Sequence, residues 1–274
     1  MEEQNQLQKD KENPRRRPAG RLRLAVPAVL LLAFVVLGLL NGLNGAPQNT
    51  RPAKNPYTPE DFTTLDGYVT CTAGPTRRGL DVSKHQGPID WEQVRSAGFD
   101  FAIIRIGYRG NTAGEIFPDS MARDNLAGAK AAGFDVGVYF YSQAISPEEA
   151  MEEAQWCLDF LAGEHLDLPL VYDWEYVSPS ARTGAMDRKT LTECALTFCR
   201  TVEASGYQPM VYFNGHISRD LLDLKAIEGY PFWLAQYKDQ MDYPYKVHFW
   251  QYTETGTVPG IDGNVDIDLM FLYE

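Results

Sequence analysis

Three short stretches, AGFDFAII (97–104), AGFDVGVY (132–139) and SGYQPMVY (205–212), share one pattern and decide the fold. In each of them a glycine that ends a helix is followed by an aromatic residue and then by an apolar strand, as a repeated turn from helix to strand requires. Strands that alternate with helices in this way predict a parallel sheet covered by the helices.

Around these turns the sequence predicts eight strands and four helices. We expect the strands at residues 79–83, 101–106, 136–141, 169–174, 209–213, 232–236, 247–252 and 265–270, and the helices around 90–97, 120–132, 147–162 and 188–205. Eight strands favour an α/β fold closed into a (β/α) barrel like the TIM barrel. The last connections are too short for good helices, so we expect an irregular second half. An open doubly wound sheet is the alternative, but DVSKHQG (81–87) has one glycine and makes a poor phosphate loop.

The N-terminal region differs from the rest in charge and in apolar character. Residues 1–50 carry seven basic and four acidic side chains, and the other 224 residues carry a net charge of −15, which excludes nucleic acid as a partner. Residues 24–40 are uncharged, follow an arginine cluster, and could span roughly 26 Å as a helix. We therefore predict a cytoplasmic basic segment (1–23), a single transmembrane signal anchor (24–40), an extracytoplasmic linker (41–77) and a barrel domain (78–274). A cleaved signal peptide, with secretion, is the alternative.

Carboxylates recur at the strand ends where parallel barrels place their active sites. Asp173 and Glu175 are two residues apart and therefore share one face, roughly 7 Å apart along the strand. Asp81 in the first strand and Asp266 in the last add two more. A lone aspartate at a strand end is more often a cap or turn residue. A set of four across three strands instead favours glycosidic bond hydrolysis, in which one carboxyl donates a proton and a second stabilises the sugar cation.

Aromatic and amide side chains in the same strands are candidates for binding the flat faces of sugars. The predicted substrate-binding residues are Tyr108, Tyr139, Tyr141, Tyr212, Trp233, Gln236, Trp250 and Gln251, although core packing is expected to account for some of the rings. The four cysteines, Cys71, Cys157, Cys194 and Cys199, show no metal-ligand spacing, and their pairing is left open. Without a histidine ligand motif or a GxSxG elbow, the sequence predicts no metal and no cofactor.

Three motifs together resemble glycoside hydrolase family 25, the Chalaropsis-type lysozymes or N-acetylmuramidases. They are GLDVSKHQG (79–87), VYDWE (171–175) and WQYTETGTVPGIDGNVDIDLM (250–270). The resemblance implies an irregular α/β barrel that cleaves the β-1,4 bond between N-acetylmuramic acid and N-acetylglucosamine in peptidoglycan.

The resemblance also implies a role for each of the four carboxylates. Glu175 matches the general acid of the family, and Asp173 matches the carboxylate that assists the N-acetyl group or the sugar cation. Asp81 and Asp266 match flanking acids, and no role is transferred to Asp268. Two alternatives remain: a catalytically silent glycan-binding module, and a barrel glycosidase that acts on a chitin-like polymer.

Overall fold

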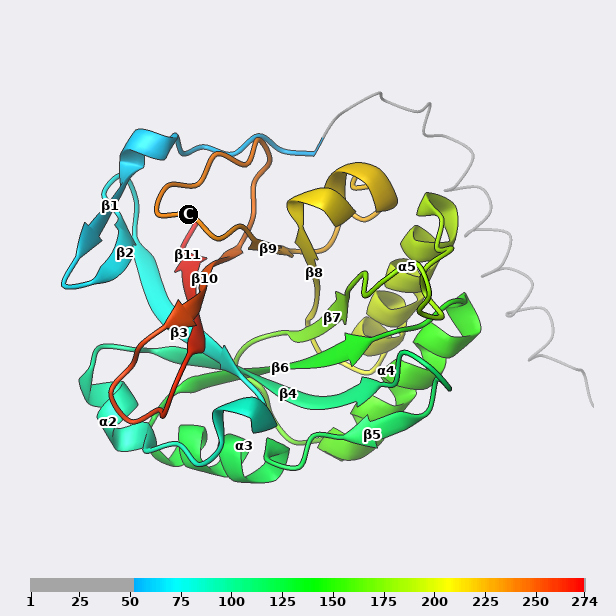
Figure 1. The fold of residues 1–274 in the computed structure, drawn as a ribbon, viewed down its shortest axis with the longest axis horizontal. Coiled ribbons are helices and arrows are strands. Elements are labelled where there is room, and N and C mark those ends of the chain that lie inside the picture. Colours follow the sequence, from blue (N-terminus) through cyan, green and yellow to red (C-terminus); the bar gives the residue numbers. More distant parts are fainter. Residues whose placement is uncertain (1–51, 274) are drawn as a thin grey trace, which may run out of the picture. The chain divides into compact units, whose positions relative to one another are not determined.

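The computed structural model describes residues 52–273, which form an α/β barrel. Eight strands close the ring in the order β3-β11-β10-β9-β8-β7-β6-β4, and β4 pairs back to β3 (Figure 1). Their bounds are β3 (Thr76–Val82), β4 (Phe101–Arg109), β6 (Asp135–Ser142), β7 (Leu170–Trp174), β8 (Pro209–Asn214), β9 (Phe232–Ala235), β10 (Phe249–Gly256) and β11 (Val265–Phe271). All eight predicted strands are present. A short ninth strand, β5 (Ile116–Pro118), pairs with the end of β4 and was not predicted.

The strands run parallel as predicted, with one exception that corrects the expected topology. Strand β11 is antiparallel to both of its neighbours, β10 and β3. The reason is the length of the connection, because only residues 257–264 separate β10 from β11. A return to a parallel strand needs about a dozen residues or more, so this short segment can only turn the chain back.

The helices follow the first strands, and the second half of the barrel lacks long ones, as predicted. The helices are α2 (Trp91–Ser96), α3 (Ala122–Ala131), α4 (Pro147–Leu161) and α5 (Arg188–Ala204). After β8 the chain forms only a short π-helical turn (Ile217–Leu221). The glycines of the three helix-to-strand turns, Gly98, Gly133 and Gly206, have φ angles of 88°, 77° and 86°. Only glycine adopts this conformation without steric cost, which explains the repeated motif.

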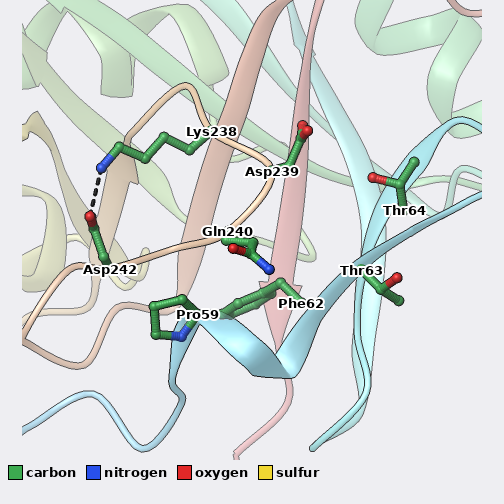
Figure 2. A pocket seen from close by; sticks show the side chains of 8 residues that line it. All are labelled: Pro59, Phe62, Thr63, Thr64, Lys238, Asp239, Gln240 and Asp242. Atoms are coloured by element: carbon green, nitrogen blue, oxygen red, sulfur yellow. Dashed lines mark hydrogen bonds and ion pairs between the residues drawn. The ribbon is translucent and has the colours of Figure 1, made fainter.

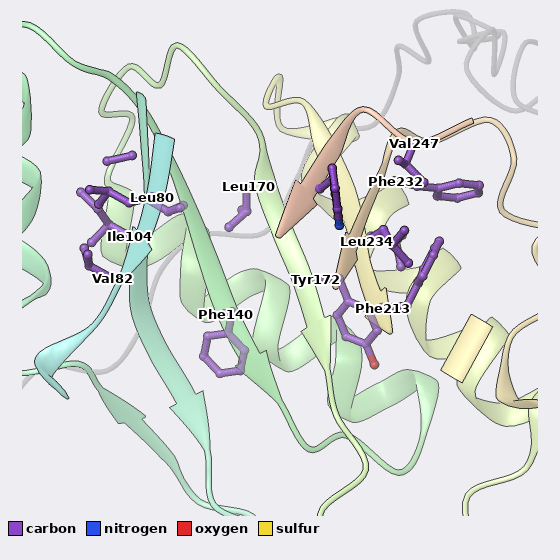
Figure 3. Close-up of a cluster of buried hydrophobic side chains, with 14 of the residues drawn as sticks. Leu80, Val82, Ile104, Phe140, Leu170, Tyr172, Phe213, Phe232, Leu234 and Val247 are labelled. Atoms are coloured by element: carbon purple, nitrogen blue, oxygen red, sulfur yellow. The ribbon is translucent and has the colours of Figure 1, made fainter. Parts of the chain in front are cut away.

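Two apolar layers result from the alternation of side chains along the strands. Inside the barrel a small cluster forms around Phe101, Ile103 and Phe249. The larger core lies outside the ring, between the strands and their covering segments. Figure 3 shows side chains of this outer core along β3, β4 and β6 to β9, among them Leu80, Phe140 and Tyr172. Because the interior cluster is small, polar residues occupy the barrel interior at the end where the parallel strands terminate.

Part of the predicted linker is folded, which corrects the boundary at residue 77. Residues 52–77 include a 3-10 turn, η1 (Pro59–Asp61), and a hairpin of β1 (Phe62–Leu65) and β2 (Tyr68–Cys71). Phe62 is 2% exposed and packs edge-on against Trp250, with ring centroids 5.0 Å apart. The hairpin therefore belongs to the barrel domain, because its few apolar residues complete the outer core.

The predicted anchor at 24–40 and the basic segment before it lie outside the described residues. Within residues 52–273, the structure contains no helix with the length and apolar character needed to cross a bilayer. The four cysteines are free, and Cys157, Cys194 and Cys199 are buried as small core residues.

Candidate active site

A cavity of about 250 Å³ opens at the end of the barrel where the parallel strands terminate. Its walls come from β3, β4 and β6 to β11 and from the loops that follow them. The lining residues are Asp81, Ser83, His85, Gln86, Arg105, Tyr139, Tyr141, Asp173, Glu175, Tyr212, Trp233, Tyr237, Gln251, Glu254 and Asp266. All four predicted carboxylates are therefore brought together in one cavity.

Strand alternation places the pair on β7 as the sequence predicts. Asp173 and Glu175 both line the cavity, whereas Trp174 points outward and donates its Nε1–H to the carbonyl of Ala144 at 3.1 Å. Asp173 is only 4% exposed, and Glu175, just beyond the strand end, is partly open to solvent. Of the two, Glu175 can exchange a proton with water more readily.

Strand β11 contributes to the same end of the barrel because it runs in the opposite direction. Its first residues, not its last, meet the ends of the parallel strands, and Asp266 lies directly opposite Asp81 in the β3–β11 register. The reversal that sequence analysis missed is thus what brings Asp266 into the cavity.

Hydrogen bonds fix the floor of the cavity around Gln251. Its Nε2–H donates to Asp81 Oδ2 at 2.6 Å, and its Oε1 accepts from the hydroxyls of Tyr212 at 3.0 Å and Tyr237 at 3.2 Å. Because the Asp81 carboxylate offers acceptors only, the amide presents its N–H donor to Asp81 and its Oε1 to the two hydroxyls. Gln251 therefore orients Asp81.

Burial raises the pKa values of all four carboxyls, and neighbouring negative charges add to each shift. Burial, with Asp266 and then Glu254 adding repulsion, raises the pKa of Glu175 to about 7. Burial, followed by the charge of Glu175, raises the pKa of Asp173, and the charge of Arg105 opposes that shift. For Asp81 the pKa is raised by burial and by the neighbouring aspartates, and for Asp266 burial raises it to about 6. The cluster therefore retains protons near neutral pH.

Arg105 brings a positive charge into this acidic cavity, and sequence analysis did not select it. Its Nε–H donates to Asp119 at 2.8 Å, and the Asp119 carboxylate also accepts from the backbone N–H groups of Lys84 and Met121. The Arg105 Nη2 and the Asp173 Oδ1 are both buried without a hydrogen-bond partner among the described residues. Asp119 thus holds the Arg105 guanidinium in place, and the Nη2 donor of Arg105 remains unused.

Buried polar contacts hold the loop that follows Glu175. The Gln143 Nε2–H donates to the carbonyl of Glu175 at 2.8 Å, and the hydroxyl of Thr183 donates to Gln143 Oε1 at 3.1 Å. Arg182 donates to the Gln143 carbonyl at 2.6 Å and forms an ion pair with Glu149. These contacts fix the backbone from which Glu175 projects.

Five of the eight predicted substrate-binding residues line the cavity: Tyr139, Tyr141, Tyr212, Trp233 and Gln251. The other three, Tyr108, Gln236 and Trp250, lie outside this lining. Tyr108 follows a register shift in β4 and stacks on Phe117 with centroids 5.5 Å apart. Trp250 faces the outer core because it alternates with Gln251, and its Nε1–H donates to the carbonyl of Gln236 at 2.8 Å. The side chain of Gln236 accepts from the backbone of Asp242, so it stabilises a loop.

The cavity also contains residues that sequence analysis did not select, such as Ser83 and Glu254. Ser83 lies in the loop after β3, and Glu254 lies in β10 beyond a register shift, where simple strand alternation no longer predicts which way a side chain faces. For Arg105 a signal existed: it is a charged residue in the apolar run FAIIRI (101–106), two residues from the inward-facing Ile103.

A second hollow, of about 560 Å³, lies between the N-terminal hairpin and the loop after β9. Figure 2 shows its lining, which includes Phe62 and the ion pair of Lys238 with Asp242 at 2.6 Å. None of the four clustered carboxylates lines it. We therefore place the active site in the barrel cavity.

A closed α/β barrel with clustered carboxyls and aromatic rings at its mouth has the features of a barrel glycoside hydrolase. The chain matches the family described as Glycosyl hydrolases family 25 over residues 80–261, and it belongs to that family.

Among curated proteins, the chain is 28% identical over 194 residues to the autolytic lysozyme of Clostridium acetobutylicum, covering 70% of this chain and 55% of that protein. It is 27% identical over 284 residues to lysozyme M1 of Streptomyces globisporus, covering 88% and 89%. The chain thus spans only about half the length of the Clostridium relative.

Solved structures of an autolysin and of a family 25 hydrolase share the fold of this chain. The modular autolysin LytC of Streptococcus pneumoniae, solved with a synthetic peptidoglycan ligand, superposes with a TM-score of 0.66 at 26% identity, covering 77% of this chain and 52% of that one. A family 25 hydrolase from Bacillus anthracis superposes with a TM-score of 0.62 at 20% identity, covering 80% and 95%.

Proposed function

We propose that this domain is a peptidoglycan hydrolase, a muramidase that cleaves the β-1,4 bond from N-acetylmuramic acid to N-acetylglucosamine. The observation that carries the proposal is the convergence of Asp81, Asp173, Glu175 and Asp266 in one cavity lined by aromatic rings. Family membership supports hydrolysis of a glycoside, and lysozymes and autolysins among the relatives favour peptidoglycan as the substrate.

In this proposal Glu175 is the general acid. A pKa of about 7 keeps roughly half of the Glu175 side chains protonated at neutral pH, so that a proton is available for the glycosidic oxygen. Its position at the open side of the cavity lets water restore that proton after each turnover. The same group, once ionised, can take a proton from the water that completes hydrolysis.

Asp173 is the second reacting group. It lies deeper in the cavity, near Arg105, and is placed to work under the sugar ring. The substrate carries an N-acetyl group whose carbonyl oxygen can bond to the anomeric carbon as the leaving oxygen departs. Asp173 would orient that group and stabilise the positive charge, giving net retention without an enzyme-bound ester.

Reducing-end analysis tests the substrate and the bond. Purified peptidoglycan is digested, reduced with borohydride and hydrolysed, and the sugar alcohols are identified. Muramitol is expected, in buffer and in chelator alike. Glucosaminitol alone would assign the activity to a glucosaminidase, and binding without new reducing ends would favour the silent glycan-binding module. Turnover of chitin oligomers in preference to peptidoglycan would favour the chitin-type glycosidase.

We also propose that residues 24–40 anchor the protein in the cell membrane as a single-pass helix, with the barrel outside. The support is the uncharged stretch and the arginine cluster before it. Protease added to spheroplasts should remove the barrel and leave a small membrane-embedded fragment. Recovery of a soluble protein that starts near residue 47 would show instead that the segment is a cleaved signal.

A further inference from the structure

Positive and negative charges are unevenly distributed around the active-site cavity. Arg105 is the only lysine or arginine among its lining residues, and a second cation, Lys84, lies next to two lining residues, Ser83 and His85. The other charged lining residues are five acids: Asp81, Asp173, Glu175, Glu254 and Asp266. The loop after β3 and the adjacent strand β4 therefore carry the positive charge at the mouth of an otherwise acidic cavity.

The backbone fixes Lys84 at this position. It begins a short 3-10 turn, η2 (Lys84–Gln86), which the hydroxyl of Ser83 caps. The backbone N–H of Lys84 donates to Asp119 Oδ2 at 3.1 Å, and the same carboxylate oxygen accepts from Arg105 Nε–H at 2.8 Å. Because both cations are tied to Asp119, the turn is held against β4.

Two stacked rings extend this cationic edge outward. Tyr108, near the end of β4, is the register partner of Phe117 on β5, and the two rings stack with centroids 5.5 Å apart. Lys84 Nζ lies 5.2 Å from the centroid of Tyr108, and Arg105 Cζ lies 5.5 Å from it. Phe117 is 40% exposed. An apolar surface thus adjoins a positive charge at the end of the barrel where the cavity opens.

The charge of Lys84 is available to a ligand. Its side chain is exposed, and none of the ion pairs in residues 52–273 includes it. Asp119 does not neutralise it, because that carboxylate is ion-paired with Arg105. The contact with Tyr108 occupies a ring face and leaves the N–H donors of the ammonium free for an anion.

The proposed substrate has a part that matches such a surface. Muramic acid carries a lactyl group on its 3-oxygen, and a peptide stem with free carboxylates extends from that group. If the sugar occupies the cavity, the stem must leave through the cavity mouth. The five lining acids repel the stem carboxylates, whereas Lys84 attracts them, so the stem should leave over the loop after β3.

We propose that Lys84, Tyr108 and Phe117 form a subsite for the peptide stem of muramic acid. The Lys84 ammonium binds a stem carboxylate, and the stacked rings contact the apolar parts of the peptide. This subsite rests on the proposed function and adds to it a preference for stem-bearing strands. Lys84 is in this sense a specificity-determining residue and takes no part in bond cleavage.

Kinetics on matched substrates test the subsite. The first is soluble, uncross-linked peptidoglycan freed of phosphate-containing polymers, and the second is the same material with its stem carboxylates converted to amides. An activated aryl glycoside, which has no stem, is the third. Amidation removes the negative charge and keeps the shape of the stem. It should lower the wild-type kcat/KM about two- to fivefold, the effect of one exposed charge pair, and less at high salt.

Substitutions then assign this effect to a residue. Lys84→Met should lose about two- to fivefold in kcat/KM on the anionic strands, become insensitive to amidation, and match wild type on the aryl glycoside. Lys84→Glu should prefer the amidated strands. Phe117→Ala should lower kcat/KM on both kinds of strand alike. Lys189→Met, whose lysine side chain is 84% exposed on α5, is the matched control and should behave as wild type.

Two kinetic results would overturn the subsite. Lys84→Met could remain as sensitive to amidation as wild type, which would show that Lys84 does not bind the stem charge. It could instead lose as much on the aryl glycoside as on the strands, which would give Lys84 a structural role. A Lys84 effect confined to strands that retain phosphate-containing polymers would also contradict the proposal, because the anion would then be a phosphate.

Binding separates this inference from the proposed function. A single muramic acid with its stem has no bond to cleave, and NMR titration gives its Kd for wild type and for Lys84→Met. We expect Lys84→Met to raise the Kd about two- to fivefold for the charged peptide and not for its amidated form. If wild type shows this dependence but hydrolyses no strand, the proposed function fails and the stem-binding site stands. If it hydrolyses strands without regard to stem charge, the subsite fails and the proposed function stands.

Discussion

Replacement of Glu175 by glutamine should remove the proton donor and the alkaline limb of the pH profile together. With a pKa of about 7, Glu175 is roughly nine-tenths protonated at pH 6 and roughly one-tenth protonated at pH 8. The wild-type rate on peptidoglycan should therefore fall about tenfold per pH unit above pH 8. Glu175→Gln should lose about 10²–10⁴-fold on the same substrate. An activated aryl glycoside needs little protonation, so on it the variant should lose much less.

The same substitution should change how stability depends on pH. The folded state raises the pKa of Glu175 from 4.5 to about 7, so it binds the proton more tightly than the unfolded state does. That contribution is complete below the unfolded pKa and is lost as pH rises through 7. Its size is roughly 3 kcal/mol, at about 1.4 kcal/mol per pKa unit. Glutamine cannot ionise, so the variant should not show this loss.

The assay compares initial rates on both substrates from pH 5 to pH 9, with urea unfolding at pH 4.5 and pH 8. Glu92→Gln, at an exposed position on α2, is the matched control and should behave as wild type in both measurements. An alkaline limb that is equally steep with the aryl glycoside would refute the assignment of that limb to Glu175. Retention of more than a tenth of the activity on peptidoglycan by Glu175→Gln would refute its role as the acid.

Three further predictions follow from the same structure. Asp173→Asn should slow hydrolysis of both substrates, because the sugar cation must be stabilised whatever group departs, and NMR should find the first product with retained configuration. Rescue of this variant by the activated substrate would reverse the roles of Asp173 and Glu175. An inverted product would exclude the substrate-assisted route. Phe62→Ala should lower the free energy of unfolding in urea by about 3–5 kcal/mol. Leu65→Ala, at a position that is 59% exposed, should change it by less than about 0.5 kcal/mol. Equal effects would show that the hairpin does not complete the core. Arg109→Met should lower the free energy of unfolding by about 3–5 kcal/mol, because it leaves the buried Glu153 without its ion-pair partner at 2.7 Å. The double variant Arg109→Met with Glu153→Leu should recover much of that stability. If it does not, the broken ion pair is not the cause of the loss.

The barrel could be predicted from the sequence because local sequence patterns identify its strands. The turns at Gly98, Gly133 and Gly206 repeat one backbone requirement, and strand alternation alone puts Asp173 and Glu175 on one face. The direction of β11 could have been inferred as well, since the short connection at 257–264 excludes a parallel return.

Other features depend on tertiary contacts that no local pattern reports. The hairpin at Phe62 has too few apolar residues to show a periodic pattern, and Phe62 packs against rings from distant parts of the chain, such as Trp250 and Phe271. Both Trp250 and Gln251 were predicted to bind substrate, although neighbours in a strand face opposite ways and only Gln251 could face the cavity. Arg105 was missed although its charge within an apolar run was a local signal; its pairing with Asp119, which comes from a different segment, could not be predicted.

The antiparallel closure of the barrel has a consequence for how the protein folds. Strand β3 (Thr76–Val82) pairs with β11 (Val265–Phe271), so the seam joins segments almost 190 residues apart in the chain. Contacts this distant are costly to form and slow folding, because the intervening chain must be ordered first. Asp81 and Asp266 meet only at this seam, so a barrel in which β11 has not yet paired lacks part of its carboxyl cluster. We therefore expect hydrolytic activity to appear only after β11 has paired with β3.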